Sequence, residues 1–283
     1  MSTRVAASLR NLLALPTLVW MLLFFLVPLA MVLVYSFASI SLVTYNIGFG
    51  WTLSNYRQIH DPLYFDTLTR SLFLSASTTL GCLLLGFPLA YYISRQPSRW
   101  QKLLLVAVIV PFWSSFIVRT YAIVNLIDNG GPLQDFLHAL HLWSGPLNIL
   151  YTPKGIAVGI IYAYLPLMVL PIYVSLERID YSLIDAASDL GANPRRTFRR
   201  VTLPLAMPGV AVGCIIVGIP ALGEYVIPQI LGGDKTLMLG NVITDQFLAV
   251  GDIPFGSAIA VALMVVMALA LVGVRLVQRA GPA

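Results

Sequence analysis

The sequence predicts an all-α integral membrane protein with six transmembrane helices. The 283-residue chain is 58% hydrophobic and only 10% charged, whereas an ordinary soluble domain is about 25% charged. It contains six apolar stretches close to the roughly 20 residues that cross a bilayer. Cys82 and Cys214 both lie inside apolar runs, so we expect neither a disulfide framework nor a metal site built on them.

The six predicted spans cover about 15–38, 70–94, 103–127, 155–176, 205–227 and 255–277. Arg4 and Arg10 precede the first span, as they would in a signal peptide. Its apolar run is too long for a signal peptide, however, and no small-x-small cleavage site follows at the right distance. We interpret the first span as a retained signal anchor.

Prolines and a glycine interrupt two of these spans. The Pro111–Trp113 segment marks a place where the third span is expected to bend, because proline removes a helix hydrogen bond. Pro220, Gly223 and Pro228 interrupt the fifth span. Such a break frees backbone carbonyls, which must then line a cavity or be buried in protein.

Basic residues alternate between the two sides of the predicted membrane. The N-terminal segment, the 95–102 loop, the 177–204 loop and the C-terminal segment together carry twelve Lys and Arg residues. The alternate loops carry four, namely Arg57, Arg70, Lys154 and Lys235. The positive-inside rule therefore puts both termini and the 177–204 loop in the cytoplasm. The formal net charge of +5 follows from this topology and gives no support for nucleic-acid binding.

The long loops on the other side, 39–69 and 128–154, are rich in aromatic residues and prolines. Loops of this kind suit a docking platform, although the belt at the membrane interface is the simpler explanation for any single ring. Their histidines, His60, His138 and His141, have no zinc-site spacing. No metal site is predicted.

The 177–204 loop is polar and basic and lies between two apolar spans, and its sequence predicts two short helices joined by a turn. Ser182 is a candidate N-cap of the first helix. Asp185, three residues later, would complete a variant capping box with it. Leu183, Ala187 and Leu190 then form one apolar face.

The turn and the second helix follow from the next residues. Gly191 lies where a helix favours a left-handed residue, and Asn193 with Pro194 suits the N-cap and first turn of a new helix. This helix carries one large apolar residue, Phe198, and four arginines: Arg195, Arg196, Arg199 and Arg200. We expect Phe198 to be an apolar plug for a partner protein, with the arginines at its rim. The alternative is that the arginines only obey the positive-inside rule.

The spacing within this loop resembles the cytoplasmic loop of ABC importer permeases. The family pattern is Glu-Ala-Ala, three residues, Gly, nine residues, Ile-x-Leu-Pro, and this chain matches its spacing, with Asp in place of Glu and Val201 in place of Ile. In that family the loop is the coupling helix, which docks into a groove on the ATPase subunit. The resemblance therefore implies the type I ABC importer permease fold. It also implies an ATPase-coupling role for Asp185, Ala186, Ala187, Gly191, Phe198, Arg199, Leu203 and Pro204.

Two ionisable residues fall within or near the predicted spans, where charge is costly and commonly functional. Arg119 lies in the third span and Glu224 in the break of the fifth. A broken helix with a charge is a recurring way to build a substrate site in a transporter. The alternatives are a structural ion pair for Arg119 and a merely solvated side chain for Glu224.

Further motifs resemble the permeases of spermidine and putrescine importers over nearly the whole chain. They are Pro111–Trp113 with Val118–Tyr121, the Asn55–Tyr64 loop, and Gly223–Pro228 with Leu231–Gly233. Relatives for other cationic or small organic solutes share parts of them. The resemblance implies three kinds of partner: a second homologous permease, an ATP-binding subunit dimer and an extracytoplasmic solute-binding protein. It also implies a location in the bacterial inner membrane.

A polyamine is a flexible polycation, which needs carboxylates and, through cation–π contact, aromatic faces. The residues expected along the substrate pathway are Glu224, Tyr225, Tyr121, Asp128, Trp113 and Arg119. Arg119 would repel the cargo unless it is neutralised. The expected mechanism is alternating access, in which the partner ATPase uses ATP and Mg²⁺ while this chain binds no cofactor and performs no covalent chemistry.

Two other classes of protein compete with this reading. A secondary transporter or a channel could have six spans, but has no reason to carry the coupling loop. An integral membrane enzyme would need a nucleophile–base pair or a metal spacing, and the sequence offers neither. We therefore expect residues 1–283 to form a single transmembrane permease domain, with the coupling loop at 177–204 within it.

Overall fold

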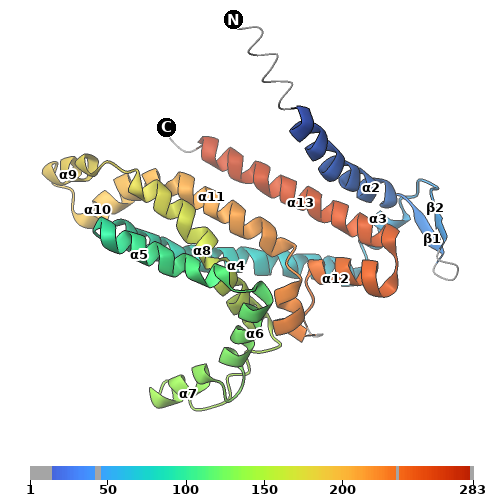
Figure 1. Cartoon of the computed structure of the whole chain (residues 1–283), viewed down its shortest axis with the longest axis horizontal. Helices are drawn as coiled ribbons and strands as arrows, with labels where there is room; N and C mark the ends of the chain where they lie inside the picture. Colours follow the sequence, from blue (N-terminus) through green and yellow to red (C-terminus); the bar gives the residue numbers. More distant parts are fainter. Residues whose placement is uncertain (1–14, 42–45, 234–235, 281–283) are drawn as a thin grey trace, which may run out of the picture. The chain divides into compact units, whose positions relative to one another are not determined.

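The computed structural model describes residues 15–41, 46–233 and 236–280 and shows an almost entirely helical chain (Figure 1). Five helices are long and apolar enough to cross a membrane: Leu15–Tyr35, Pro62–Ser94, Pro153–Glu177, Pro194–Leu222 and Ile253–Arg275. A sixth candidate is the pair Ser98–Trp113 and Phe116–Ala139, which is bent by 98°. The prediction of six membrane stretches is confirmed for the described residues. Arg4, Arg10 and Lys235, which entered the charge count, lie outside them.

The chain divides into two compact units. Unit 1 comprises the described residues of Met1–Pro62 together with Val242–Val265, and unit 2 those of Leu63–Asn241 together with Val266–Ala283. Unit 2 contains both the coupling loop and the break in the fifth span.

Unit 1 begins with the first span, which runs through a π-helical turn, η1 (Leu22–Leu26), into α2 (Val27–Tyr35). None of the apolar window that qualifies it as a span is buried. A helix that is apolar all round yet exposed needs lipid or protein around it, so the interpretation as a membrane span is sound. The antiparallel strands β1 (Ser39–Ser41) and β2 (Asn46–Gly48) follow, with Ile40 opposite Ile47.

Polar contacts hold the short helix α3 (Ser54–Gln58) against the end of α2. The Asn55 side-chain amide donates to the carbonyls of Ser36 at 3.0 Å and Ala38 at 2.8 Å. These carbonyls belong to the helix end and the turn after it, where backbone groups lack helical partners.

The sequence analysis treated 39–69 as a loop. The structure corrects this, because the segment contains a hairpin and α3, and the second span begins at Pro62 rather than residue 70.

The last span is preceded by helices that the sequence analysis did not predict. α12 (Leu239–Asp245) continues into the π-helical turn η6 (Gln246–Val250), which ends at Gly251 in the left-handed conformation. α13 (Ile253–Ala280) then begins, and the Asp252 side chain accepts the Phe255 N–H at 3.0 Å. This is an ordinary N-cap, and it explains why the helix starts there.

The centre of unit 2 is formed by α4 (Pro62–Ser94), α8 (Pro153–Glu177) and α11 (Leu203–Leu222). Gly209 and Gly213, four residues apart on α11, let it approach α8 closely. A Cβ at Gly213 would lie 2.7 Å from the Met168 sulfur, and one at Gly209 would collide with the Pro171 carbonyl. Small residues at this spacing are the usual way for membrane helices to pack backbone to backbone.

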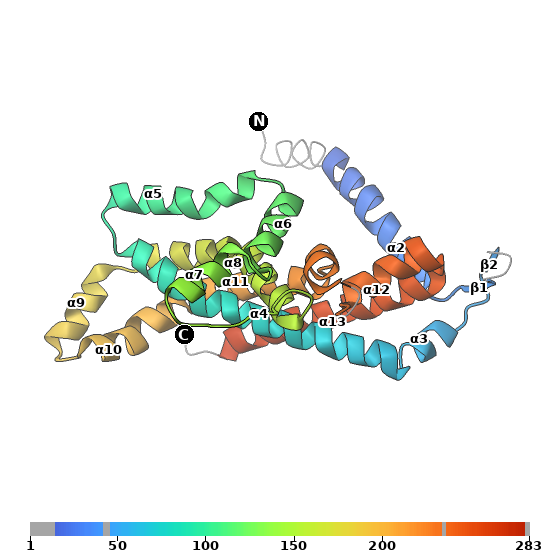
Figure 2. The same cartoon turned by 90° about the horizontal axis from the view of Figure 1, so that it is seen from below.

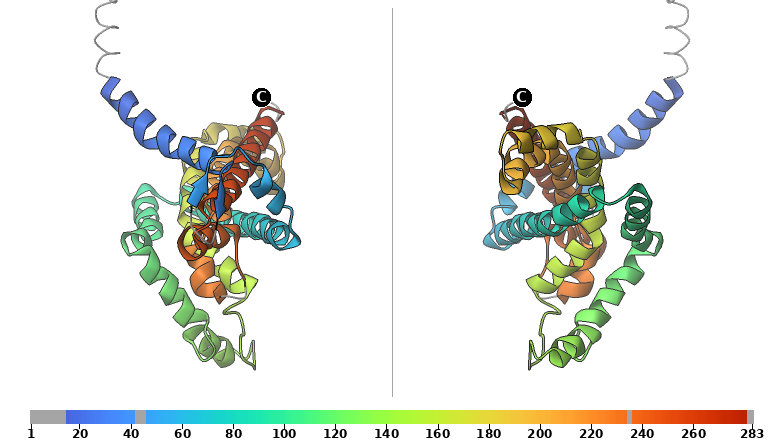
Figure 3. Two further views of the ribbon diagram at one scale, coloured as in Figure 1. Left: turned by 90° about the vertical axis from the view of Figure 1, so that its right-hand side faces the viewer. Right: turned by 90° about the vertical axis from the view of Figure 1, so that its left-hand side faces the viewer.

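The third span is broken rather than gently bent. α5 (Ser98–Ile109) ends in a 3₁₀ turn, η2 (Val110–Trp113), and α6 (Phe116–Ile127) leaves in a new direction (Figure 2). Pro111 cannot donate a helix hydrogen bond, and Ser114 is extended, with ψ of 155°. α6 leads to α7 (Pro132–Ala139), which lies away from α8 and α11 (Figure 3). The single span predicted over 103–127 is therefore two helices, and α7 occupies part of the predicted loop.

Candidate functional site

The first helix of the coupling loop is α9 (Tyr181–Asp189). Its N-cap is Asp180, whose Oδ1 accepts the Ser182 N–H at 2.9 Å. This backbone hydrogen bond lowers the pKa of the exposed Asp180 carboxyl. The expected capping box of Ser182 and Asp185 is therefore wrong, because Ser182 already lies inside the first turn.

Gly191 ends α9 as predicted. Its φ is +77°, and the Ala192 N–H bonds to the Ala187 carbonyl at 3.0 Å while the Gly191 N–H bonds to the Ser188 carbonyl at 2.9 Å. This pair of hydrogen bonds is the Schellman pattern, which requires a left-handed residue at the glycine position. The chain therefore turns sharply between the two helices of the loop.

The second helix begins at Asn193, whose side chain accepts the Arg196 N–H at 2.8 Å. α10 (Pro194–Thr197), the π-helical turn η3 (Phe198–Thr202) and α11 form one helix that runs from Pro194 to Leu222. The Leu203 N–H bonds five residues back to the Phe198 carbonyl, next to Pro204, which has no N–H to donate. The loop is thus continuous with the fifth span, and no flexible joint separates them.

The predicted coupling residues differ in exposure. Asp185, Ala186, Arg199 and Pro204 are exposed, whereas Ala187 and Leu203 are half-buried. The expected apolar face of α9 is only partly correct, because Ile184 and Ala187 turn toward the rest of the chain. Leu183 is 48% exposed and Leu190 is 90% exposed. Leu190 is therefore an apolar side chain that projects from the turn.

Phe198 packs inside the chain. Its ring meets the rings of Phe87 and Tyr91 on α4 edge-on, at centroid distances of 5.9 and 5.6 Å. This contact ties the coupling loop to the end of α4, so the loop and the basic 95–102 segment lie at the same end of unit 2 (Figure 1). The two loops therefore lie at one end of the unit, which agrees with the orientation expected from the basic-residue count. The role of Phe198 as a plug stays a prediction.

The break in the fifth span is organised around Glu224, which is 7% exposed. α11 ends at Leu222, and the Glu224 carboxylate caps the turn that follows. Oε1 accepts the N–H groups of Val226 at 3.0 Å and Ile227 at 3.4 Å, and Oε2 accepts the Tyr164 hydroxyl at 2.6 Å. The carboxylate thus satisfies backbone donors freed by the break, as any backbone at membrane depth requires.

Two further side chains form hydrogen bonds with the segments that follow the break. The Asn241 amide, 1% exposed, donates to the Tyr225 carbonyl at 2.9 Å and to Gln229 Oε1 at 3.0 Å. Ser71 Oγ on α4 accepts the Leu239 N–H at 2.8 Å. Neither residue was singled out in the sequence, nor was Tyr164 given a polar role. The hydrogen-bond partners of Asn241, Tyr164 and Ser71 at these contacts lie 12, 60 and 168 residues away along the chain. No local sequence pattern therefore predicts these contacts.

Arg119 does not pair with Glu224. Its guanidinium lies over the rings of Phe112 and Phe116, at 4.7 and 5.7 Å from their centroids. Its Nε is buried and has no hydrogen-bond partner in the described part of the chain. The two phenylalanine rings supply cation–π contact, which offsets part of the cost of burying the charge.

The remaining pathway candidates are exposed. Trp113 is 82% exposed, Tyr121 54% and Tyr225 48%. Asp128 is exposed at the end of α6, where Oδ1 accepts the Asn129 N–H at 2.8 Å. The structure therefore joins Glu224 and Tyr225 at the break. It leaves Trp113 at the end of η2, Arg119 and Tyr121 on α6, and Asp128 at the end of that helix.

Comparison with known proteins gives a consistent result. Residues 7–280 match the family described as binding-protein-dependent transport system inner membrane component. The spermidine/putrescine transport system permease protein PotB of Salmonella typhimurium (strain SL1344) is 40% identical over 252 residues, 89% of this chain and 88% of that protein. PotB of Escherichia coli (strain K12) is also 40% identical, over 89% of this chain and 91% of that protein. The inner membrane ABC transporter permease protein YdcU of the same organism is 36% identical over 79% of this chain and 75% of its own length.

Two solved structures share the fold at lower identity. A bacterial ABC transporter involved in the import of the acidic polysaccharide alginate matches with a TM-score of 0.76 and 17% identity, over 97% of this chain and 96% of that chain. The methionine ABC transporter MetNI matches with a TM-score of 0.57 and 17% identity, over 79% of this chain and 99% of that chain. The protein has the fold of type I ABC importer permeases, as the coupling-loop spacing implied. It belongs to the family of binding-protein-dependent transport system inner membrane components, the permease subunits of ABC importers.

Proposed function

We propose that this chain is the permease subunit through which an ABC importer carries polyamines such as spermidine and putrescine. The observation that carries the proposal is the 40% identity to spermidine/putrescine permeases over 89% of the chain. The buried carboxylate of Glu224 beside the exposed ring of Tyr225 supports it, because ammonium groups favour carboxylates and aromatic faces.

The assembled importer contains a second homologous permease, a dimer of ATP-binding subunits and an extracytoplasmic solute-binding protein. One solved relative of the fold is a complex with a periplasmic protein that holds an alginate pentasaccharide, which supports the last of these partners. The ATP-binding subunits use ATP and Mg²⁺. This chain binds no cofactor and acts as a translocation subunit, not as an enzyme.

The chain works as one permease domain in the bacterial inner membrane, with both termini and the 177–204 loop in the cytoplasm. The basic residues of the 95–102 and 177–204 segments support this orientation. The contact of Phe198 with Phe87 and Tyr91 supports it too, since it puts these two segments on one side.

Coupling follows from the continuity of the helices. ATP binding closes the ATPase dimer and moves α9 and α10, and the exposed Asp185, Ala186 and Arg199 lie where that contact is made. Because Pro194–Leu222 is one helix, displacement of α10 is passed to the break at Gly223. Ala187, Gly191, Leu203 and Pro204 hold the shape of the turn and of the helix that carries the motion.

The cargo pathway passes the break in α11 and the bend of the third span. Glu224 and Tyr225 attract an ammonium group at the break, and Trp113, Tyr121 and Asp128 offer aromatic and acidic surface elsewhere along the route. Arg119 limits where a cation can rest. In the state described here Tyr164 holds Glu224, so the ammonium group must share or displace that hydroxyl.

Uptake of labelled cargo tests the proposal. The chain is produced with its cognate partners in cells that lack polyamine import, and uptake of labelled spermidine and putrescine is measured with and without this chain. We expect uptake that depends on the chain and on the solute-binding protein. Uptake of another small cation without either polyamine would favour the neighbouring substrate class, and uptake of an anion alone would overturn the cargo assignment.

A further inference from the structure

The start of α12, residues 239–241, packs against the backbone of the break in the fifth span, within unit 2. A Cβ at Gly240 would lie 2.6 Å from the Gly223 carbonyl oxygen and 2.7 Å from that of Glu224. Only glycine allows the two backbones to approach this closely. The Leu239 N–H, one residue earlier, bonds to Ser71 Oγ on α4 at 2.8 Å. The first turn of α12 is therefore tied to α4 and lies directly against the residues of the candidate cargo site.

Asn241 joins this turn to the segment after the break, and its side-chain amide both accepts and donates. Its Oδ1 accepts the Met238 N–H at 3.2 Å, which caps the first turn of α12. Its amide nitrogen carries two protons and donates to the Tyr225 carbonyl at 2.9 Å and to Gln229 Oε1 at 3.0 Å. Asn241 is 1% exposed, so water does not compete for these hydrogen bonds.

A helix cap alone does not require an amide at position 241. Aspartate also accepts a backbone N–H, and its charge suits the N-terminal end of a helix. An amide, unlike a carboxylate, can accept from Met238 and still donate to two other oxygens. The two donated hydrogen bonds are what asparagine adds, and the shorter of them reaches the backbone of Tyr225.

The Tyr225 carbonyl is held by two donors. It accepts the Gln229 N–H at 3.0 Å within the short helix that follows the break, residues 226–232, and the Asn241 amide at 2.9 Å from α12. Tyr225 is 48% exposed, so the direction of its ring depends mainly on the backbone that carries it. The preceding carboxylate, Glu224, has its own partners on α8 and in the next turn. Asn241 thus orients the ring beside a carboxylate that is already fixed.

We propose that Asn241 is a positioning residue for the cargo, which holds the Tyr225 backbone so that the ring faces an ammonium group bound by Glu224. The inference rests on the proposed function, because it takes Glu224 and Tyr225 as cargo contacts. Cation–π contact requires the cation to lie over the face of the ring, within about 6 Å of its centroid. A change in ring direction therefore weakens the hold on the cargo, even though Asn241 does not touch it.

A double-mutant cycle in the reconstituted importer tests this role. Asn241→Asp keeps the cap on the Met238 N–H but loses both donated hydrogen bonds, and Tyr225→Ala removes the ring. The rate of uptake at limiting spermidine is measured for each single variant and for the pair. We expect Asn241→Asp to lower this rate about tenfold, as for the loss of one buried hydrogen bond. In the Tyr225→Ala background it should lower the rate less than about twofold, because the ring that Asn241 positions is already absent.

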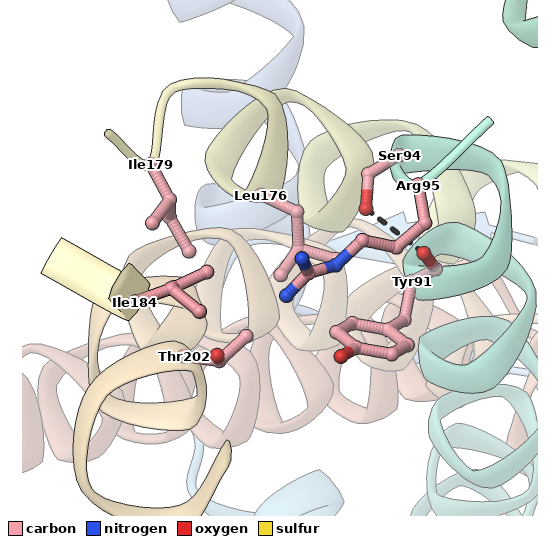
Figure 4. Close-up of a pocket in the computed structure, with 7 residues that line it drawn as sticks. All are labelled: Tyr91, Ser94, Arg95, Leu176, Ile179, Ile184 and Thr202. Carbon is pink, nitrogen blue, oxygen red and sulfur yellow. Dashed lines mark hydrogen bonds between the residues drawn. The ribbon is translucent and has the colours of Figure 1, made fainter. Parts of the chain in front are cut away.

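A second variant and two controls accompany the cycle. Asn241→Ala adds no charge and replaces Asn241→Asp if that variant does not assemble, and the same coupling with Tyr225 is expected. Asn55→Asp makes the matched change at another buried asparagine, whose amide also donates to two carbonyls. Ile184→Ala enlarges the small hollow beside Thr202 (Figure 4), at the start of α11, whereas the break follows the other end of that helix. Each control should combine with Tyr225→Ala additively, within a factor of about two.

Hydrogen–deuterium exchange separates this inference from the proposed function, because it needs neither cargo nor ATP. The amides of residues 223–229 should exchange faster in Asn241→Asp than in wild type, and those of the coupling loop should not change. Additive effects of the Asn241 and Tyr225 variants on uptake, or unchanged exchange at 223–229, would overturn the positioning role. Faster exchange in an importer that carries no polyamine would refute the proposed function. The same cycle, run with the solute that is carried, then decides the positioning role.

Discussion

Glu224 has a structural role in the break of the fifth span and a proposed role in binding the cargo. Its carboxylate is 7% exposed and bonds to two backbone N–H groups and to Tyr164. This arrangement fully explains a stable break in α11 without any cargo. A role in transport therefore requires an effect beyond the loss of a helix cap, and a suitable substitution must separate the two.

Glu224→Gln separates charge from shape. Glutamine keeps an oxygen that can accept the Val226 and Ile227 N–H groups, but it removes the negative charge. Loss of a charge-assisted contact is worth about 1.5–3 kcal/mol, or roughly ten- to hundredfold in affinity or rate. We expect polyamine uptake to fall by that factor, while assembly of the complex and basal ATP hydrolysis stay intact. Labelled uptake and ATPase assays on purified complex measure both.

Two controls accompany this variant. Asp66→Asn makes the same chemical change at an exposed carboxyl of α4 and should leave uptake unchanged. Tyr164→Phe removes the hydroxyl that holds Glu224 Oε2 and keeps the charge, so uptake should fall less than with Glu224→Gln. Equal uptake by Glu224→Gln and wild type would remove Glu224 from the pathway, and dissociation of the complex would make it a structural residue.

Single residues were predictable where their partners are local. Gly191 and Asn193 act within three residues of their own positions, and the sequence sufficed for both. The Ser182 cap failed because Asp180, two residues earlier, offers an equally good side chain and lies at the start of the helix. Tyr164 was not predictable as the partner of Glu224, since the two are 60 residues apart and meet only after α8 packs on α11.

At the scale of elements, the coupling loop depends on the left-handed turn at Gly191. A Cβ at this position would meet nothing within 4 Å, so the cost of a substitution is backbone strain and not a clash. A non-glycine residue in this conformation costs about 1–2 kcal/mol, and asparagine tolerates it best. We expect Gly191→Val to reduce transport and cargo-stimulated ATPase activity together while the chain still inserts.

Gly191→Asn is the matched control for this prediction. Asparagine adds a side chain but tolerates the left-handed conformation. Cargo-stimulated ATPase activity should therefore be close to that of the wild type. Normal cargo-stimulated ATPase activity in a correctly inserted Gly191→Val variant would show that coupling does not need the left-handed turn. Failure of both variants would point to the surface of the turn instead of its backbone.

The structure also divides the apolar residues of the loop into two kinds. Phe198 packs on Phe87 and Tyr91, and each such edge-to-face pair is worth about 0.5–1.5 kcal/mol. Leu190 is 90% exposed and packs on little within its own chain. We expect Phe198→Ala to lower the melting temperature of the complex, whereas Leu190→Ala should leave it nearly unchanged.

Copurification of the ATP-binding subunit completes this comparison. Both Leu190→Ala and Phe198→Ala should weaken association more than Arg200→Ala does, because buried apolar anchors usually outweigh charges at a rim. If Leu190→Ala weakens association with the ATP-binding subunit and leaves the melting temperature unchanged, Leu190 contacts that subunit directly. If association is salt-sensitive and lost only in arginine variants, the apolar anchors are not used.

Breaks in the helices were visible in the sequence, but their geometry was not. Pro111 and Gly223 marked both interruptions, because proline removes a hydrogen bond and glycine tolerates a turn. The 98° bend after Trp113 depends on extended residues such as Ser114 and on the packing of α6. α7 and α12 escaped prediction because both lie in stretches too short and too polar to register as spans.

At the scale of the whole molecule, hydropathy alone was sufficient for the number of spans. Each apolar stretch must satisfy its backbone internally, so length and composition decide the element almost without tertiary information. Cargo is a different matter, since a structure with the same fold belongs to an importer of an acidic polysaccharide. The fold therefore supports transport in general, and only the residues at the break and the bend bear on charge preference.

Orientation of the whole molecule rests on the uneven distribution of basic residues, and it yields a direct test. Cys82 and Cys214 are replaced by alanine, and single cysteines are introduced as Asp189→Cys in the coupling loop or Ser144→Cys between α7 and α8, both exposed positions. With the positive-inside orientation, a membrane-impermeant maleimide should label Ser144→Cys in intact spheroplasts and Asp189→Cys only after permeabilisation. Labelling in the opposite order would invert the topology and detach the coupling loop from any cytoplasmic ATPase. Labelling of both from outside would mean that the number of membrane crossings between them is even, in conflict with α8 as a span.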